Sequence, residues 1–227
     1  MKTTKELLAI FTNIDDLNIA YHVTNDNDSV DKARENLALK YNYNSKKLQY
    51  MEQIHSSIVR DVQDNKNAQR CDGLITNKIN TPLMVMVADC IPILFYDKIK
   101  RVIAVAHAGR EGTFQNISAK TIDKMINDYG CEAKNIEVQL GASIQKCCYE
   151  VSIELATQTK RKFGKQFVNN RNIDLQAINQ QQLLQKGIKI KNIEISQICT
   201  KCSNQNYFSY RNDKSCGRFA GIIMLRE

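Results

Sequence analysis

The stretch MVMVADCIPILFYDKIKRVIAVAHAGREG, residues 84–112, decides the fold of this 227-residue chain. It contains three apolar runs that are bounded by polar or turn residues, at 84–88, 91–96 and 102–106. Runs of this length, rich in Val, Ile, Met and Phe, are typical of buried strands. Cys90 stands between the first two runs, and His107 follows the third, 17 residues later. This spacing is about that of one hairpin, so we expect the thiol and the imidazole to meet.

Length and composition limit the class of protein. A chain of 227 residues can bury roughly 70% of its unfolded surface without disulfides. The sequence contains no run of 18 apolar residues, so we expect no transmembrane helix and no membrane contact. Its beginning lacks the long apolar region of a signal peptide, and we find no linker or internal repeat. We therefore expect one domain, residues 1–227, in the cytoplasm.

The charge pattern argues against nucleic acid as a partner. The net charge is +8, but the lysines are scattered along the chain, as is usual for solvated faces. No basic block with interleaved aromatic residues occurs, so we expect no nucleic-acid binding. The positive potential would still attract small anions such as phosphate.

Cysteine and histidine are the residue types that narrow the search for a site. Eight cysteines are many for a reducing compartment, where thiols serve metal binding or catalysis more often than disulfides. They are Cys71, Cys90, Cys131, Cys147, Cys148, Cys199, Cys202 and Cys216. The histidines are only three: His22, His55 and His107.

Two further groups of cysteines have weaker signals. The pair in Cys199-x-x-Cys202 resembles half of a zinc knuckle, but a single CxxC is ambiguous without a second pair. The adjacent Cys147 and Cys148 cannot easily both bind one ion, so we expect them to serve in packing. Loose thiols in a reducing cell are the favoured interpretation, with a zinc knuckle as the alternative.

The rest of the chain alternates between helical and extended patterns. Residues 1–28 are expected to be mostly extended, and 60–70 to be a polar loop. Helices are predicted at 30–43, 113–130, 153–163 and 174–186, with Thr113 as the expected cap of the second one. Strands are predicted at 47–59, 74–76, 135–140, 191–195 and 220–225. Gly73 follows Asp72 in a predicted turn, where it provides either a positive φ or a close approach of the backbone.

Three residues could share one chemical site: His55, Cys90 and His107. Two histidines and one cysteine suit a zinc ion with an open fourth position. A water would fill this position, and the ion would lower its pKa. A Cys90–His107 dyad with a thiolate nucleophile needs no metal. A buried structural cysteine beside an unrelated histidine is the third interpretation, and the residues alone leave all three open.

Several segments, in this order and near these spacings, resemble the YfiH/laccase-domain family over residues 47–227. They are QIHSSIV, CDGLIT, ADCIPILFYD, VIAVAHAGREGT, GASIQKCCYEV and the closing CT…YFSYRND…GRFAGIIML. Members have been labelled multicopper polyphenol oxidoreductases, purine nucleoside enzymes and peptidoglycan editing factors. The resemblance implies a single α/β (α+β) domain, a mixed β-sheet sandwich flanked by helices, related to the fold of bacterial toxin cysteine hydrolases.

The resemblance also implies a metal centre and a reaction. His55, Cys90 and His107 match the family's catalytic metal ligands, with zinc as the expected ion and copper as the alternative. The implied reactions are phosphorolysis of adenosine, inosine, guanosine and S-methyl-5′-thioadenosine, and deamination of adenosine. The implied partners are small nucleosides and phosphate, and we expect a monomer or a weak homodimer.

Substrate contacts are expected from three positions. Arg211 and Arg218 match family arginines, and a guanidinium fork suits oxyanions. Gly109 lies in a loop between a strand end and a helix start, where backbone N–H groups can hold phosphate. Asp72 and Asp89 are the candidates for the general acid or base.

One departure from the family and several alternative functions stay open. The family usually has HAGWRG, whereas this chain has HAGREG, so Arg110 and Glu111 replace Trp and Arg. This change either keeps a cation near the site or alters its charge preference. The same residues would also serve an amidase that removes a wrong amino acid from a UDP-muramyl peptidoglycan precursor. A non-enzymatic scaffold is less expected, as is copper-dependent phenol oxidation, since one such site cannot hold several coppers.

Overall fold

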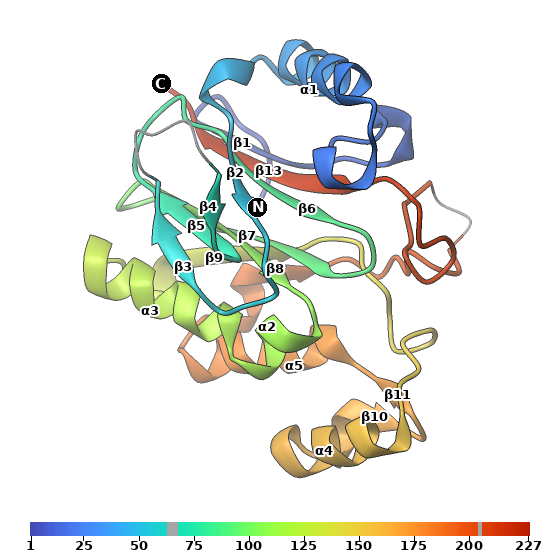
Figure 1. Cartoon of the computed structure of the whole chain (residues 1–227). Helices are drawn as coiled ribbons and strands as arrows, with labels where there is room; N and C mark the ends of the chain where they lie inside the picture. Colours follow the sequence, from blue (N-terminus) through green and yellow to red (C-terminus); the bar gives the residue numbers. More distant parts are fainter. Residues whose placement is uncertain (63–67, 204–205) are drawn as a thin grey trace.

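The computed structural model describes residues 1–62, 68–203 and 206–227, and in it two β-sheets pack face to face between helices (Figure 1). The five-stranded sheet contains, in spatial order, β1 (Leu7–Phe11), β13 (Phe219–Leu225), β6 (Leu83–Val87), β2 (Gln49–Glu52) and β4 (Gln69–Arg70). The six-stranded sheet contains β12 (Ile193–Ile195), β9 (Ile136–Leu140), β7 (Ile91–Asp97), β8 (Val102–Ala108), β5 (Gly73–Thr76) and β3 (Val59–Asp61). Both sheets mix parallel and antiparallel pairs.

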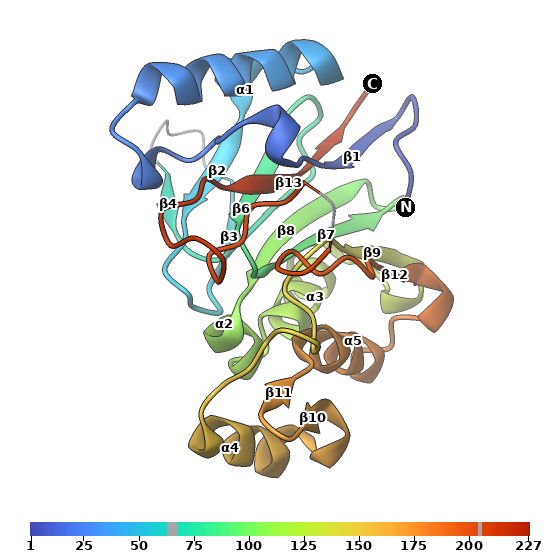
Figure 2. The same ribbon diagram turned by 90° about the vertical axis from the view of Figure 1, so that its right-hand side faces the viewer.

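Helices cover the outer face of each sheet. Helix α1 (Asn27–Tyr41) lies on the five-stranded sheet, and α3 (Ile117–Tyr129) and α5 (Leu175–Gln185) lie on the six-stranded sheet (Figure 2). Helix α4 (Ile153–Phe163) and the hairpin of β10 (Val168–Asn169) and β11 (Asn172–Ile173) project beyond α5 (Figure 2). The predicted single α/β domain, a mixed sandwich flanked by helices, is confirmed.

The central hairpin of β7 and β8 is buried on both faces. Ile93 and Phe95 point toward the helices, whereas Leu94 and Tyr96 join the core between the sheets. A strand with both faces covered needs apolar residues at every position. This explains why the sequence of the hairpin is continuously apolar, and it confirms the predicted strands.

Most predicted helices form close to their expected bounds. In α1, Val30, Ala33 and Leu37 are buried, but the helix begins at Asn27 instead of residue 30, because the Asp26 side chain accepts the N–H of Ser29. The helices predicted at 153–163 and 174–186 correspond to α4 and α5. Short 3-10 helices occur at Ile14–Asp16, Tyr21–Val23, Ser45–Lys47, Ala133–Asn135, Lys165–Phe167 and Ile190–Asn192.

The single helix predicted at 113–130 is wrong at its start. A short helix, α2 (Arg110–Phe114), comes first, and α3 begins only at Ile117. Asn116 has a φ of 63°, a left-handed conformation that Asn tolerates better than most residues and that interrupts the helix. Thr113 is not a cap, because its hydroxyl accepts a hydrogen bond from Asn179 inside the core.

The continuous strand predicted at 47–59 is also wrong. Strand β2 ends at Glu52 and β3 begins at Val59. Between them the Gln53 side chain forms two hydrogen bonds with the backbone of Met86, with its amide nitrogen 2.8 Å from the carbonyl oxygen. His55 has a φ of 58°, so the chain turns there instead of continuing extended.

The remaining segments agree with the sequence in part. Within residues 1–28, which we expected to be extended, β1 pairs antiparallel with β13, and short 3-10 helices follow. The loop predicted at 60–70 includes residues 63–67, which lie outside the described residues. Among the described helices, none is both long enough and apolar enough to cross a bilayer.

The packing of the central hairpin predicts a contrast between two isoleucines. Ile93 is fully buried in β7, whereas Ile99 in the turn after β7 is 69% exposed. Ile93→Ala should lower the free energy of unfolding by about 2–5 kcal/mol, because it leaves a cavity. Ile99→Ala should change it by less than about 0.5 kcal/mol. Urea denaturation of both variants checks this, and equal losses of stability would contradict the assigned core.

Candidate active site

His55, Cys90 and His107 come together at one end of the space between the two sheets. One ligand atom from each of the three lies within 4.8 Å of the other two. The rings of the two histidines meet edge to face, with 4.9 Å between their centroids. Cys90 packs against the core that the sheets share. The structure therefore places all three predicted residues in one cluster.

The hairpin of β7 and β8 brings Cys90 to His107. Pro92 in β7 is paired with His107 in β8, and the ladder ends one pair later. Cys90 therefore lies just beyond the last residue pair of this ladder. Side chains alternate along a strand, and His107 has the same parity as Val105, which belongs to the core between the sheets. The expectation that this thiol and this imidazole meet is confirmed.

Asp72 fixes both histidines, and the sequence did not reveal this role. Its side chain is fully buried, and its carboxylate accepts hydrogen bonds from His107 Nδ1 at 2.8 Å and from the backbone N–H of His55 at 3.1 Å. It also accepts the N–H of Ile54 and both the N–H and the hydroxyl of Ser56. These bonds stabilise the left-handed turn at His55, which is why the predicted strand breaks there.

The turn around Asp72 depends on close packing of Gly73. Its φ is not in the left-handed region, so of the two predicted reasons for a glycine the close approach applies. A Cβ at Gly73 would lie 3.0 Å from Cγ2 of Val59 and 3.3 Å from the carbonyl oxygen of Val105. A side chain here would separate β5 from its neighbours on both sides and displace Asp72.

Asp89 supports the other side of the cluster. It has a φ of 80°, and its carboxylate accepts hydrogen bonds from the Thr200 hydroxyl and from the backbone N–H of Arg211, each at 2.7 Å. Asp72 and Asp89 were the sequence candidates for a general acid or base. Both carboxylates are engaged by protein donors, so their evident role is to position neighbouring segments.

Gly109 leaves room for whatever binds at the cluster. A Cβ at this position would lie only 2.9 Å from Cys90 Sγ, and it would also contact His55 and His107. The predicted glycine therefore lines the cluster, and a side chain here would cover the thiol. In place of the predicted loop, Gly109 alone connects β8, which ends at Ala108, to α2, which begins at Arg110.

The cluster suits a thiolate beside an imidazolium. Burial alone would raise the pKa of Cys90, but the charge of His107 and hydrogen bonds from both histidines lower it to about 6. Burial alone would lower the pKa of His107, but the Cys90 charge and the hydrogen bond with Asp72 raise it to about 9. These opposite shifts have one cause, because each charge stabilises the other.

The donor set also fits a metal ion. A thiolate and two imidazoles are ligands that zinc and copper both accept. His107 uses Nδ1 for Asp72, which leaves Nε2 toward the cluster, and such a carboxylate partner is usual for histidines that bind metals. Gly109 provides the space beside the sulfur.

A cavity of about 570 Å³ opens next to the cluster. His55, Cys90 and His107 form one part of its wall. The remaining wall consists of residues in or next to strands of the five-stranded sheet, of one residue from the 3-10 helix Tyr21–Val23 and of two from the C-terminal segment: Met51, Glu52, Gln53, Met86, Val87, Ala88, His22, Tyr210 and Arg218. A volume of this size is typical of sites for small molecules. His22 was not singled out in the sequence, because nothing in its neighbourhood indicates a site.

The two predicted arginines have different positions. Arg218 lines the cavity, and its Nη1 donates to the carbonyls of Cys216 and Gly217. Among the described residues, its Nε and Nη2 groups have no hydrogen-bond partner. Arg211 is not part of the cavity wall, since its guanidinium lies 5.0 Å from the centroid of the Tyr149 ring and donates to the Glu150 carbonyl.

Arg110 and Glu111, the departure from the family pattern, form an ion pair with each other. Both side chains are about half exposed. Neither of them belongs to the cavity wall. The pair has no net charge, so in this structure the change adds neither a cation nor an anion to the cavity.

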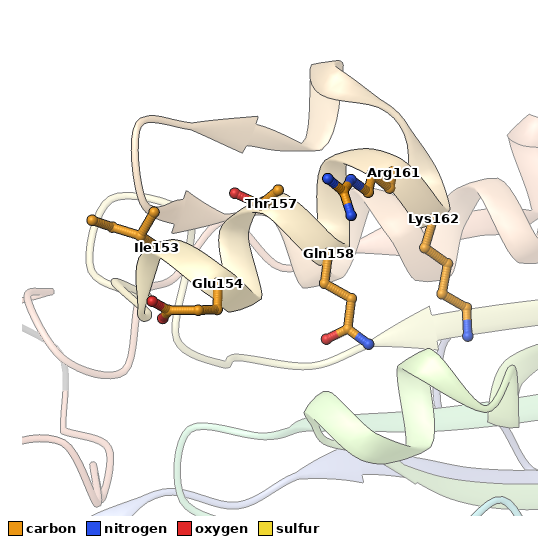
Figure 3. Close-up of a pocket in the computed structure, with 6 residues that line it drawn as sticks. All are labelled: Ile153, Glu154, Thr157, Gln158, Arg161 and Lys162. Carbon is orange, nitrogen blue, oxygen red and sulfur yellow. The ribbon is translucent and has the colours of Figure 1, made fainter.

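A second pocket lies on the surface of α4 and contains none of the residues of this cluster. All six side chains that line it belong to α4, and they spread along one surface of that helix (Figure 3). None of the predicted site residues is among them. A surface from a single helix cannot surround a ligand, so we place the candidate site at the cavity beside Cys90.

Comparisons with known proteins agree with this fold and identify the family. The family model described as multi-copper polyphenol oxidoreductase laccase matches residues 3–226. A purine nucleoside phosphorylase of Clostridium acetobutylicum is 36% identical over 193 residues, covering 83% of this chain and 81% of that protein. The crystal structure of the hypothetical protein YfiH of Bacillus licheniformis has a TM-score of 0.90 at 27% identity, over 97% of this chain and 93% of its own. YlmD of Geobacillus stearothermophilus has a TM-score of 0.90 at 26% identity, over 98% and 93%.

The coupling between Cys90 and His107 predicts how fast the thiol reacts. Only the thiolate is alkylated, so in zinc-free protein the rate at Cys90 should rise with pH around a midpoint of about 6, far below the usual value of about 8.5. Asp72→Asn removes the charge that supports the His107 imidazolium, so the midpoint should move upward. Peptide mass spectrometry after iodoacetamide treatment measures both.

A matched control separates this effect from a general loss of charge. Asp128 is an exposed carboxylate that pairs with Lys124, so Asp128→Asn should leave the midpoint unchanged. An ordinary midpoint in the wild type, or no shift in Asp72→Asn, would contradict the ion pair.

Proposed function

Because this chain belongs to the multi-copper polyphenol oxidoreductase laccase family, and its relatives include proteins named purine nucleoside phosphorylases, we propose that it cleaves purine nucleosides with phosphate. The observation that carries this proposal is the single cavity that joins the His55–Cys90–His107 cluster to the free side of Arg218. An anion-binding group and a nucleophilic or metal-binding cluster in one small-molecule cavity suit a two-substrate reaction.

The cavity has the size and polarity that a nucleoside and a phosphate need. About 570 Å³ falls within the usual range for small-molecule sites. Met51, Met86 and Val87 provide apolar wall for a purine. Tyr210, which is 46% exposed at the rim, provides an aromatic face.

We place phosphate at Arg218. Its free Nε and Nη2 groups form the fork that suits an oxyanion. In phosphorolysis the bond between C1′ and N9 breaks, and a phosphate oxygen forms a new bond to C1′. The purine leaves with the electron pair of the broken bond and takes up a proton. Arg218 would hold the phosphate against C1′ and stabilise its charge.

We assign zinc to His55, Cys90 and His107. A zinc ion at this position would supply Lewis acidity, and it would lower the pKa of a water bound to it to about 7. The protein holds the ligands in place through Asp72, which orients His107 and the turn at His55. The proposed substrates of phosphorolysis are adenosine, inosine, guanosine and S-methyl-5′-thioadenosine. The second proposed reaction is the deamination of adenosine to inosine.

A second candidate, amide hydrolysis, is supported by the Cys90–His107 pair. A thiolate beside an imidazolium is the arrangement of a cysteine nucleophile with its proton donor. Cys90 would attack the amide carbonyl, and His107 would protonate the leaving amine. Water would then hydrolyse the thioester on Cys90, which releases the carboxylic acid and restores the thiolate. The proposed substrate would be a UDP-muramyl precursor with a misplaced amino acid.

The first experiment separates these reactions. Incubation with adenosine should give adenine only when phosphate is present, and inosine whether or not phosphate is present. Cys90→Ala should abolish both products because it removes the sulfur of the cluster. Chromatography of the purines measures the outcome.

The control for this experiment is Cys131→Ala. Cys131 is a buried thiol of the core under the helices and does not line the cavity, so its loss should leave both activities intact. No reaction with any nucleoside, together with release of serine from UDP-muramyl-serine, would replace the phosphorylase proposal by the amidase. Full activity of Cys90→Ala would refute both.

A second experiment tests the phosphate position. Arg218→Ala should raise the KM for phosphate by at least about tenfold, because charge-assisted hydrogen bonds of about 1.5–3 kcal/mol are lost. Arg161, an exposed arginine on α4 (Figure 3), provides the matched control, and Arg161→Ala should leave the KM unchanged. An equal KM in both variants would remove Arg218 from the phosphate site.

A further inference from the structure

A second group of potential metal ligands lies outside the cavity. It consists of four cysteines, Cys147, Cys148, Cys199 and Cys202, and their sulfur atoms all lie within 4.8 Å of one another. None of the four lines the cavity beside Cys90. Cys199 is buried, Cys148 is half-buried, and the other two are exposed, so the cluster lies at the surface. The proposed nucleoside chemistry does not use these thiols.

The sulfur positions suit four ligands around one ion. Four sulfurs at about 2.3 Å from a tetrahedral zinc lie about 3.8 Å apart, and Cys147 Sγ lies 3.6 Å from Cys202 Sγ. A disulfide requires about 2.05 Å between sulfurs, and all four thiols are free. The cluster is therefore close to the geometry of a closed tetrathiolate site.

The backbone holds the two cysteine pairs together without the help of the thiols. Ser143 and Cys199 form a parallel bridge, with the N–H of Thr200 donating to the Ser143 carbonyl at 3.1 Å. The N–H of Ser143 donates to the Ile198 carbonyl. The N–H of Gln145 points at Cys199 Sγ, 3.5 Å away, as suits a sulfur that carries negative charge. The ligands are thus brought together before any ion binds.

Adjacent cysteines can share a ligand set here because the backbone turns. Side chains of neighbouring residues point apart in an extended chain, but residues 146–148 form a turn, in which the N–H of Cys148 donates to the Gln145 carbonyl. This turn directs the side chains of the two adjacent cysteines to the same cluster.

We propose that Cys147, Cys148, Cys199 and Cys202 bind a second, structural zinc ion. Four thiolates leave no open position, so the ion would stabilise the fold and would not take part in the reaction. The clamped segments also hold Asp89, whose backbone carbonyl accepts the N–H of Ile144 and whose carboxylate accepts the Thr200 hydroxyl. The second zinc would therefore stabilise the segment that precedes Cys90.

Zinc analysis of variants tests this proposal independently of the catalytic centre. The Cys90→Ser variant should keep one zinc ion per chain, the ion bound by the four cysteines. The double variant Cys199→Ser with Cys202→Ser should lose this ion. Cys216→Ser, which removes a half-buried thiol outside the cluster, should change nothing. If the wild type contains zinc and Cys90→Ser contains none, the second site is overturned. Wild-type zinc that disappears only in the double variant would support the second site and refute the zinc proposed at Cys90.

Two further measurements test the second site without the double variant, in case that variant does not fold. Cobalt added to metal-free Cys90→Ser should give the intense near-ultraviolet absorption of several thiolate ligands. In zinc-loaded wild type, Cys147 and Cys202 should resist alkylation despite their exposure, and a chelator should make them reactive. Rapid alkylation of both cysteines in the presence of zinc, or a disulfide within the cluster under reducing conditions, would refute the proposal.

Discussion

The buried carboxylate of Asp72 is the constraint on which the candidate site depends. A carboxylate removed from water is costly unless donors surround it, and Asp72 accepts five hydrogen bonds from two separate parts of the chain. Burial by itself would raise the pKa of this carboxyl, but His107 and Ser56 hold it below its usual value. The charge that orients His107 therefore also determines where the chain turns at His55.

The sequence predicted the parts of this arrangement that depend on local pattern. The apolar runs on either side of Cys90 indicated the central hairpin, and the hairpin by itself brings Cys90 to His107. Helix periodicity identified α4 and α5 within a residue or two. These features follow from side-chain spacing along a few consecutive residues, which a single sequence shows directly.

The features that the sequence did not predict depend on contacts between distant residues. The strand predicted through His55 breaks because a carboxylate 17 residues later binds its backbone. His22 reaches the cavity only through the packing of the whole domain. Thr113 looked like a helix cap, but its hydroxyl is used by Asn179, 66 residues away. Residue types alone contain no signal for such partners.

The order of strands in the five-stranded sheet has a consequence for synthesis of the protein. Strand β13 lies between β1 and β6, so residues 219–225 hold together two strands that the ribosome produces far earlier. The central strands of the other sheet, by contrast, are complete once residue 140 has emerged. The nascent chain can thus form the Cys90–His107 hairpin early, but half of the sandwich waits for β13. During this interval β1 and β6 expose apolar edges, and chaperones would recognise the unfinished chain there.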